Sequence, residues 1–243
     1  MNLVIDVGNS FVKLAVFKSD EIQYREVIRL KAVLEAISVL KARYSNLNKA
    51  IISSVGQLNQ YQIASIQGEF DTLILGVDTL LPFHNQYKTP KTLGVDRIAL
   101  VSAAINLYPN NNTLIIDAGT CITYDFVNSQ KQYLGGAIAP GLMMRYKSLN
   151  NLTANLPLLK LSMPQSITGN STTECMHSGV VFGVINEIEG AIAQYQDKYS
   201  DLTVILTGGD AKFLSKQLKS SIFAHSNFLL EGLNYILQIN SNE

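Results

Sequence analysis

The sequence has no net charge, no long basic run and no long apolar run, and each absence removes a class of protein. Nineteen lysines and arginines balance nineteen aspartates and glutamates, which argues against nucleic acid as the main partner. No stretch reaches the roughly 20 apolar residues of a membrane-spanning helix. The N-terminal segment has no basic region, and Asp6 interrupts its only apolar run, so we expect neither a secretory signal nor a membrane anchor.

Cysteine and histidine are also scarce. The two cysteines, Cys121 and Cys175, are far apart and show no metal-site spacing, and the three histidines are scattered. We interpret both cysteines as small buried apolar residues and expect a reducing, cytoplasmic setting. An apolar fraction of 47% with 16% charged residues is typical of a packed globular protein. A length of 243 residues allows one large domain or two small ones.

Two stretches of the sequence resemble each other. LVIDVGNSFVKLAVF occupies Leu3–Phe17, and LIIDAGTCITYDFV occupies Leu114–Val127. Each contains an apolar run, an aspartate, a small residue, a glycine, a polar pair and a second apolar run. Asp6 and Asp117 stand at the matching places. The β-branched and aromatic residues on both sides of the polar turn predict a hairpin in each stretch.

The order of the other predicted elements also recurs. In the first half we predict helices over Lys31–Tyr44, Tyr61–Ile66 and Gly94–Tyr108, and strands over Ala50–Val55 and Leu73–Leu75. In the second half we predict strands over Tyr133–Ala139 and Leu202–Thr207, and helices over Thr172–Tyr199 and Ala211–Leu218. A hairpin followed later by a strand, a turn and a helix thus occurs twice. This predicts a duplicated α/β unit with two facing lobes, residues 1–110 and 111–243, without a flexible linker between them.

An acid inside an apolar strand needs a partner, because a buried unpaired carboxylate costs several kcal/mol. A metal cation is one such partner for Asp6 and Asp117. The glycine two residues later lets backbone N–H groups approach an anion, and Lys13 would reach the same anion. Acid, glycine turn and lysine are the parts of a phosphoryl-transfer site. An ordinary hairpin turn is the alternative, and the second copy together with TGGD at Thr207–Asp210 makes it the weaker interpretation.

Six motifs, spread in order along most of the chain, resemble those of a known family. They are DVGNSFVK (Asp6–Lys13), GVDR (Gly94–Arg97), DAGTCITYD (Asp117–Asp125), GGAIAPGL (Gly135–Leu142), GNSTTECMHSG (Gly169–Gly179) and TGG (Thr207–Gly209). The sequence resembles the actin-like ATPase superfamily, which includes sugar kinases, and within it the type III pantothenate kinases. Small departures are Ser10, where threonine is common, and Cys121-Ile122 after the second Asp-x-Gly.

The resemblance implies two ribonuclease H-like domains, with mixed sheets, flanking helices and a cleft between the lobes. It also implies a homodimer that phosphorylates the primary hydroxyl of pantothenate with ATP, the first step towards coenzyme A. Magnesium and a monovalent cation, potassium or ammonium, would be the cofactors. One alternative is another small-molecule kinase of the superfamily, against which the acceptor-side residues Gly94–Arg97 and Tyr87 argue. A second is a non-catalytic ATP-binding regulatory protein, against which Asp6, Lys13 and Asp96 argue.

The family's site residues map onto this sequence motif by motif. The resemblance assigns ATP binding to Asp6, Val7, Gly8, Asn9, Ser10, Phe11, Val12, Lys13 and Thr120. It assigns pantothenate binding to Tyr87, Gly94, Val95, Asp96, Arg97 and Thr172, with Asp96 as the catalytic base. It places magnesium near Asp6 through an indirect contact and makes Asp117 a ligand of the monovalent cation. For Tyr87, an ordinary loop aromatic otherwise, the assignment depends on the resemblance alone.

Several of these residues also have a purely structural interpretation. Asp96 opens a predicted helix, where the helix dipole favours an acid whatever its function. Thr172 also fits the N-cap of the next long helix, with Cys175 at the capping-box position, and the two roles are compatible. Pro140-Gly141 is either a simple turn or a wall near the phosphates. Glycines 179, 183 and 190 indicate close approach by another helix, either in a dimer interface or inside one lobe.

Overall fold

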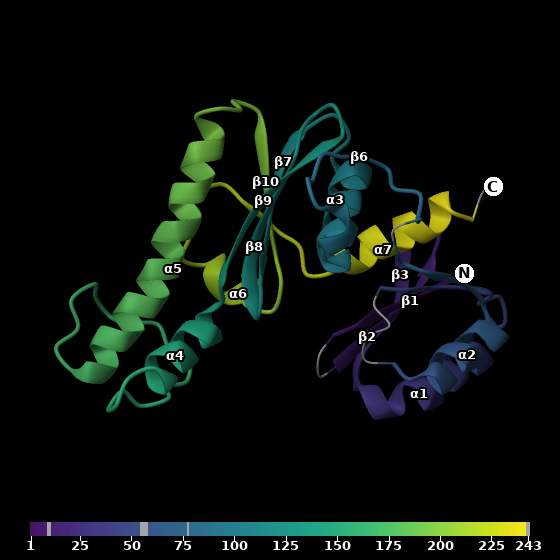
Figure 1. Cartoon of the computed structure of the whole chain (residues 1–243), viewed down its shortest axis with the longest axis horizontal. Coiled ribbons are helices and arrows are strands. Elements are labelled where there is room, and N and C mark those ends of the chain that lie inside the picture. Colours follow the sequence, from purple (N-terminus) through teal and green to yellow (C-terminus); the bar gives the residue numbers. More distant parts are fainter. Residues whose placement is uncertain (9–10, 54–57, 77, 242–243) are drawn as a thin grey trace. The chain divides into compact units, whose positions relative to one another are not determined.

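The computed structural model describes residues 1–8, 11–53, 58–76 and 78–241, which form two compact units (Figure 1). The first unit contains Met1–Pro109 and the C-terminal segment that begins at Asn227, and the second contains Asn110–Ser226. The sequence-based division into residues 1–110 and 111–243 therefore differs from the structure in this C-terminal segment. The segment forms helix α7 (Phe228–Ile239), which packs against strands β1 (Asn2–Val7) and β4 (Lys49–Ile52) of the first unit.

The first unit is built on a mixed sheet in the order β3-β2-β1-β4-β5. Strand β2 (Phe11–Lys18) pairs antiparallel with β1 and with β3 (Glu21–Arg29), while β4 and β5 (Asp71–Ile74) continue the sheet in parallel. The other elements of this unit are α1 (Val33–Arg43), α2 (Gln60–Glu69), the short strand β6 (His84–Asn85), α3 (Val95–Leu107) and the 3-10 turns Leu30–Ala32 and Pro90–Thr92.

The second unit repeats this arrangement, with the strand order β9-β8-β7-β10-β11. Strand β8 (Cys121–Val127) pairs antiparallel with β7 (Asn112–Ala118) and β9 (Gln132–Pro140), and β10 (Leu202–Thr207) and β11 (Phe223–Ala224) continue in parallel. Its helices are α4 (Leu142–Asn151), α5 (Thr172–Gln196) and α6 (Ala211–Leu214). These five strands match the five strands of the first sheet one for one, so the predicted duplication of a ribonuclease H-like α/β unit is confirmed.

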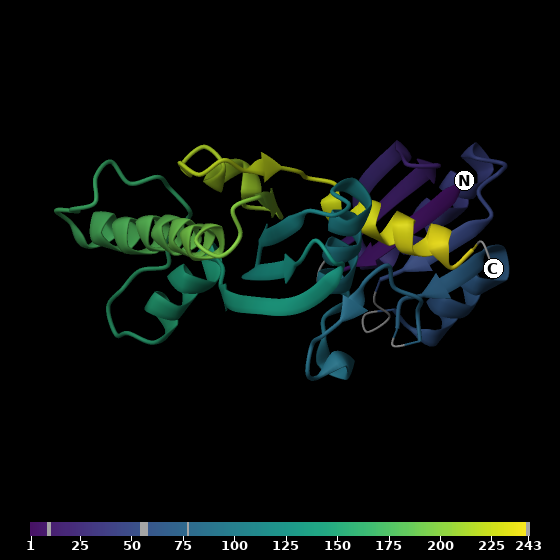
Figure 2. The same ribbon diagram turned by 90° about the horizontal axis from the view of Figure 1, so that it is seen from above.

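Alternating residues of β1 separate the two faces of the first sheet. Leu3, Ile5 and Val7 join the hydrophobic core to which α1 and α2 contribute. Helix α7 covers the opposite face (Figures 1 and 2), where Asn2 Nδ2 donates to Asn234 Oδ1 at 2.9 Å. Each fully buried leucine or isoleucine contributes roughly 1.5–3 kcal/mol, so β1 and the acid near its end are held firmly.

Helix α3 is a core helix, because its residues from Arg97 to Ile105 are all buried. It packs against α7. Gly232 permits this contact, since a Cβ at that position would lie 1.9 Å from the carbonyl oxygen of Ala99. The GVDR motif therefore begins a helix whose position is set by close packing.

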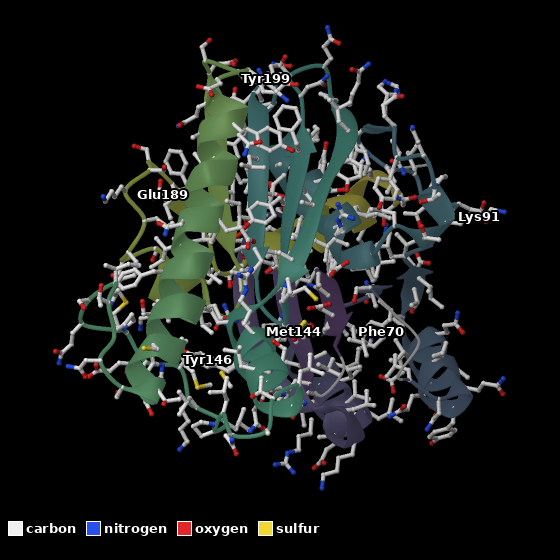
Figure 3. The ribbon with its side chains drawn as sticks, turned by 60° about the vertical axis from the view of Figure 1, so that its left-hand side comes forward. Phe70, Lys91, Met144, Tyr146, Glu189 and Tyr199 are labelled. Atoms are coloured by element: carbon white, nitrogen blue, oxygen red, sulfur yellow. The ribbon has the colours of Figure 1, made fainter. Side chains whose placement is uncertain are left out.

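The core of the second unit lies on one face of its sheet, under α4, α5 and α6. Apolar side chains of β7, β8 and β10 meet buried residues from α5 such as Val181, Val184 and Ile188. At the C-terminal end of α5, the ring of Phe126 lies 5.0 Å from Tyr195 and 4.5 Å from Tyr199 between centroids. Tyr199 is labelled in Figure 3. This aromatic group fixes α5 along the sheet.

The predicted elements differ from the observed ones mainly at their ends and in what was not assigned. The predicted helix Ala211–Leu218 is only one turn, α6, and β6 lies where no strand was predicted. Strand β3 and helices α4 and α7 have no predicted counterpart. In the part of the chain that the structure describes, no helix is long and apolar enough to cross a membrane.

Candidate functional site

The carboxylate of Asp6 lies in a defined set of contacts on the first unit. Asp6 pairs with Lys13 across the β1–β2 hairpin, and Lys13 Nζ lies 3.1 Å from Asp6 Oδ2. Ser53 Oγ donates to Asp6 Oδ1 at 2.9 Å. The side chain of Asp6 is 13% exposed and that of Lys13 is 47% exposed. The predicted acid and lysine are therefore brought together, with an accessible cation beside a largely buried anion.

The rest of the predicted ATP-binding loop contains both buried and exposed side chains. Gly8 N–H donates to the carbonyl oxygen of Phe11 at 3.0 Å, which closes the turn. The side chains of Val7 and Val12 belong to the hydrophobic core, so a contact with a nucleotide would come from their backbone, whereas Phe11 is exposed. Asn9 and Ser10, which were also predicted to bind ATP, lie outside the described residues.

The GVDR motif forms the beginning of α3. Gly94 is the N-cap residue, and Asp96 Oδ1 accepts a hydrogen bond from the backbone N–H of Arg97 at 2.9 Å. The Asp96 carboxylate is exposed and folds back over Gly94, where a Cβ would lie 2.3 Å from Oδ1. The positive end of the helix dipole favours an anionic side chain at this place. Gly94 and the Arg97 N–H thus hold the Asp96 carboxylate in a fixed orientation towards the solvent.

Tyr87 and Arg97 meet beside this carboxylate-bearing turn. The Arg97 guanidinium lies 5.5 Å from the centre of the Tyr87 ring, and Arg97 is 5% exposed. Tyr87 N–H donates to Asn85 Oδ1 at 2.9 Å, which anchors the loop after β6. The structure therefore brings Tyr87 to the GVDR motif, although six residues lie between them in sequence. Val95, between Gly94 and Asp96, is half-buried.

On the second unit, the TGG turn lies against the end of the strand that carries Asp117. Gly208 has a φ of +96°, and a Cβ there would lie 2.3 Å from both Asp117 Oδ1 and the carbonyl oxygen of Ala118. The backbone N–H of Asp210 donates to the same Ala118 oxygen at 2.9 Å. Only glycine fits this contact, so the two motifs, far apart in sequence, form one surface around the half-buried Asp117.

Thr120 stands on an adjacent turn of the same surface. The carbonyl oxygen of Thr120 accepts from the N–H of Gly141 at 3.1 Å, and a Cβ on Gly141 would lie 2.1 Å from the oxygen of Gly119. Thr120 itself is exposed. Pro140-Gly141 is therefore packed against the second Asp-x-Gly turn.

Asp210 was not among the predicted site residues, although TGGD had been noticed. Burial raises the pKa of its carboxyl group, which is about half-buried. Its backbone ties it to the strand of Asp117 through Ala118. The second unit thus places two acids, Asp117 and Asp210, at neighbouring turns, and the only signal for the second was its place directly after the glycine pair.

Thr172 begins α5 but is not its N-cap, so that structural interpretation was wrong by one residue. Ser171 is the cap, and its Oγ accepts from the N–H of Glu174 at 3.3 Å. Glu174 occupies the capping-box position that had been given to Cys175, and it accepts from Asn170 N–H at 3.0 Å. Cys175 is exposed and Cys121 is half-buried, so the expectation of two buried cysteines was also wrong.

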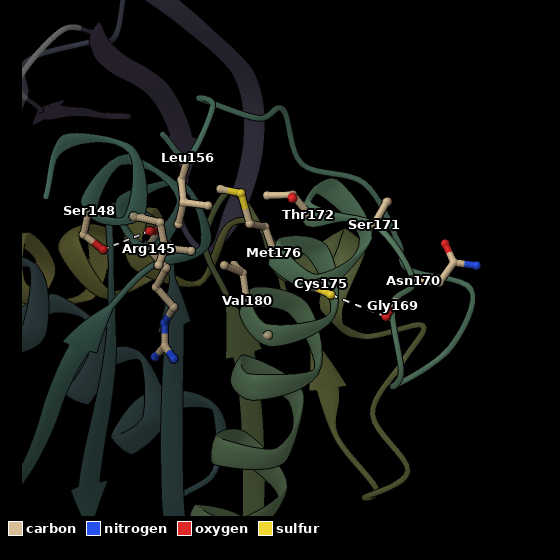
Figure 4. A pocket seen from close by; sticks show the side chains of 12 residues that line it. Arg145, Ser148, Leu156, Gly169, Asn170, Ser171, Thr172, Cys175, Met176 and Val180 are labelled. Atoms are coloured by element: carbon tan, nitrogen blue, oxygen red, sulfur yellow. Dashed lines mark hydrogen bonds between the residues drawn. The ribbon is translucent and has the colours of Figure 1, made fainter. Parts of the chain in front are cut away.

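A cavity of about 850 Å³ lies beside Thr172, between α4, the following loop and α5. Leu156, Met176 and Val180 point towards one another there, while the Arg145 guanidinium extends away from them (Figure 4). Arg145 Nη2 instead pairs with Glu187 Oε2 at 2.6 Å. Thr172 therefore lies on the rim of a largely apolar cavity within the second unit.

The metal-binding side chains fit a magnesium ion that is also bound by water and phosphate better than a metal ion bound by protein side chains alone. Among the residues that the structure describes, no group of three or more His, Cys, Asp or Glu side chains could hold a metal ion. Magnesium is usually bound through one or two carboxylates, several waters and the phosphates of a substrate. Asp6 supplies one carboxylate, 13% exposed, beside a glycine turn and so matches that requirement.

The chain is similar to several known proteins. A family model described as type III pantothenate kinase matches residues 2–194. The Christiangramia forsetii protein of that name is 49% identical over 243 residues, covering 100% of both chains. The Flavobacterium johnsoniae protein of the same name is 44% identical, covering 98% of each chain.

Solved structures also resemble this fold. A Campylobacter jejuni protein assigned provisionally to the Baf family of transcriptional activators has a TM-score of 0.65 at 22% identity, covering 99% of this chain and 100% of that one. A glucokinase from an Antarctic psychrotroph has a TM-score of 0.54 at 11% identity, covering 98% of each chain. At these identities the likeness shows the fold alone.

Proposed function

This chain belongs to the type III pantothenate kinase family, and we propose that it transfers the γ-phosphoryl group of ATP to the primary hydroxyl of pantothenate. The observation that carries the proposal is the arrangement at the start of α3. There Asp96 presents an exposed carboxylate, which accepts a hydrogen bond from the Arg97 N–H and occupies the space left by the missing side chain of Gly94. The contact between Tyr87 and Arg97 lies beside it. In the proposed acceptor site, this carboxylate would meet the alcohol of the substrate.

Asp96 would orient the pantothenate hydroxyl and accept its proton as the phosphoryl group arrives. A loose transition state requires little early deprotonation, so a carboxylate is a sufficient base. Tyr87, Gly94, Val95 and Arg97 would surround the acceptor, and the family resemblance also assigns Thr172 to pantothenate binding. Because the Arg97 guanidinium is buried under the Tyr87 ring, it offers a fixed positive charge for an anionic acceptor.

We assign contacts with ATP to the glycine turn that follows the strand acid in each unit. Asp6 to Lys13 would form the first phosphate loop and Thr120 would contact ATP from the second. Bound magnesium would neutralise charge on the transferred phosphoryl group, with Asp6 as its indirect ligand. Asp117, held against Gly208, would bind a monovalent cation, potassium or ammonium.

We extend the proposal to a homodimer formed through α5. A Cβ on Gly179, Gly183 or Gly190 would find no atom within 4 Å, so packing inside the unit does not explain these glycines. Each costs roughly 1 kcal/mol relative to alanine in a helix, and their spacing places them on one face. Beside Gly190, a cavity of about 850 Å³ is lined by residues of α5, β8 and β9. A helix of a second copy is the proposed occupant.

The decisive experiment measures ATP consumption by the purified chain with and without pantothenate. We expect turnover only when pantothenate is present and magnesium is supplied. Turnover with a sugar instead of pantothenate would indicate another kinase of the superfamily. Nucleotide binding without turnover on either acceptor would indicate a regulatory protein. Repeating the assay in sodium, potassium and ammonium buffers tests Asp117, because equal rates in all three would remove its cation role.

A further inference from the structure

Ser53 is a buried serine that no motif indicates. It follows β4, is 2% exposed, and its backbone N–H donates to the Ile5 carbonyl oxygen at 3.0 Å. The residue thus extends the pairing of β4 with β1 to the level of Asp6. Serine at the end of a strand is common, which is why the sequence alone does not single it out.

The hydroxyl of Ser53 has one acceptor contact and one donor contact. Its Oγ accepts from the backbone N–H of Val7 at 3.1 Å and lies 2.9 Å from Asp6 Oδ1. Because Asp6 can only accept when ionised, the single hydroxyl proton is directed at the carboxylate. The backbone of β1 therefore orients the serine, and the serine orients the side chain of the preceding residue in β1.

The two oxygens of Asp6 are held in different ways. Oδ1 receives the hydrogen bond of a buried, neutral hydroxyl on a packed strand. Oδ2 is contacted by Lys13, whose side chain is 47% exposed. A long exposed lysine can exchange its partner at little cost, since surface ion pairs contribute about 0–1 kcal/mol. The serine contact is permanent by comparison.

We propose that Ser53 is a positioning residue for metal–nucleotide binding: it locks the Asp6 carboxylate so that Oδ2 stays available to the hydrated cation when Lys13 turns to the phosphates. This rests on the proposed function, in which Asp6 serves magnesium. Groups that orient a metal-binding carboxylate typically change metal affinity or activity by 10–100-fold. Loss of the Ser53 hydroxyl should therefore weaken magnesium-dependent nucleotide binding by about that factor.

The test compares S53A, S53T and D6N with S102A as the matched control. Ser102 is equally buried in the same unit, and its hydroxyl donates only to the Ile98 carbonyl oxygen at 2.9 Å. Calorimetry measures binding of a non-hydrolysable ATP analogue at several magnesium concentrations, and thermal melting measures stability. Turnover with pantothenate gives KM for magnesium-ATP and kcat separately.

We expect S53A to melt about as low as S102A, since each loses one buried hydrogen bond. Of these two variants, S53A alone should bind the analogue about 10–100-fold more weakly than wild type and need more magnesium for half-saturation. S53T, which keeps the hydroxyl, should recover most of this affinity. Binding by S53A within twofold of wild type, or an equal loss in S102A, would overturn the proposal.

The results for D6N and S53A also distinguish a failure of the Ser53 inference from a failure of the proposed function. If D6N weakens magnesium-dependent binding and S53A does not, the role of Ser53 is refuted while that of Asp6 stands. If D6N binds the analogue as wild type does, Asp6 does not serve the metal, and both assignments fall together. Absence of turnover with pantothenate leaves the binding comparison intact, because that comparison uses no acceptor.

Discussion

Gly94 and Asp96 form a pair in which the missing side chain of one makes room for the carboxylate of the other. The backbone angles of Gly94, φ −60° and ψ 136°, are open to alanine. A Cβ would nevertheless lie 2.3 Å from Asp96 Oδ1. Gly94→Ala should therefore leave the fold intact but displace the carboxylate, and a misplaced catalytic group can cost about 10²-fold in rate.

The measurement for Gly94→Ala is kcat together with the melting temperature. Gly68→Ala on α2 is the matched control, because a Cβ there meets nothing within 4 Å. The control should keep wild-type turnover and gain stability, since alanine is favoured over glycine in a helix by roughly 1 kcal/mol. Unchanged turnover in Gly94→Ala would mean that the carboxylate position is not critical.

Asp96→Asn tests the proposed catalytic base. Asparagine keeps the shape and the capping contact to Arg97 N–H but cannot accept a proton. We expect kcat to fall by about 10²–10⁴-fold, with nucleotide binding and melting temperature nearly unchanged, since the lost helix-dipole interaction is worth only about 0.3–1 kcal/mol. A kcat within a few-fold of wild type would leave Asp96 as a helix-start acid only.

Asp210 predicts a pH dependence of stability. Burial raises the pKa of its carboxyl above the unfolded value, so the folded state favours the protonated form. The contribution of the protonated Asp210 carboxyl to the free energy of unfolding is complete below the unfolded pKa. It is lost as pH rises through the folded pKa. Asp210→Asn has no such loss. Its melting temperature should exceed that of wild type at pH 7, and the difference should shrink towards about pH 4.

Glu189, in the same unit, predicts a pH dependence of stability of the opposite sign (Figure 3). Burial raises its pKa, but the Ser220 hydroxyl and the backbone N–H groups of Lys219 and Ser220 outweigh this and lower it. That stability is present above the unfolded pKa and is lost as pH falls through the folded pKa. Glu189→Gln should therefore melt below wild type at neutral pH, with the deficit vanishing in acid. A lower melting temperature for Asp210→Asn than for wild type at pH 7 would contradict the Asp210 assignment, and an unchanged or higher one for Glu189→Gln would contradict that of Glu189.

At the scale of elements, the contact between α3 and α7 depends on one glycine. A Cβ on Gly232 would lie 1.9 Å from the oxygen and 2.7 Å from the carbon of the Ala99 carbonyl, and backbone cannot yield as a side chain does. Gly232→Ala should destabilise the chain by about 1–3 kcal/mol or more, lowering the melting temperature by roughly 2–4 °C per kcal/mol.

The same Gly68→Ala variant is the control for Gly232→Ala, because both replace a helical glycine of the first unit. Hydrogen exchange of the α3 amides would locate the damage. Faster exchange in α3 is expected only in Gly232→Ala. A stabilised Gly232→Ala would show that the two helices separate at no cost.

Arg145 joins three elements of the second unit. Its Nη2 pairs with Glu187 of α5, its Nε donates to the Pro140 carbonyl oxygen at 2.9 Å, and Tyr124 of β8 donates to Glu187 at 2.9 Å. Both charged side chains are partly buried, so removing one partner would leave a poorly solvated charge. The network connects the proposed dimer helix to the turn beside Thr120.

At the scale of the whole molecule, the open glycines of α5 predict an assembly. Gly190→Leu places a side chain where a second helix is proposed to pack, beside the cavity along β8 and β9. We expect sedimentation velocity to show a dimer for wild type and a shift towards monomer for Gly190→Leu. Gly68→Leu, equally open on α2, should sediment as wild type does. A wild-type chain that is monomeric and fully active would refute the dimer.

The sequence by itself determined the duplicated fold and the main site motifs. Alternating apolar residues specify a strand locally, because one face must be buried, and so both hairpins could be recognised from Leu3–Phe17 and Leu114–Val127. The glycine-flanked acids were equally visible, since turn chemistry is encoded within a few residues. Helix α7 was not assigned to the first unit, because its partners β1 and α3 lie more than a hundred residues earlier.

Only the tertiary structure decided which residues support the acids. Ser53 meets Asp6, Gly208 meets Asp117 and Gly232 meets Ala99 because strands and helices distant in sequence pack side by side. No local pattern encodes such a contact, since a serine or a glycine at the end of an element fits an ordinary turn as well. The glycines of α5 show the reverse case: their pattern was visible in the sequence, and the structure showed that nothing within the unit covers them.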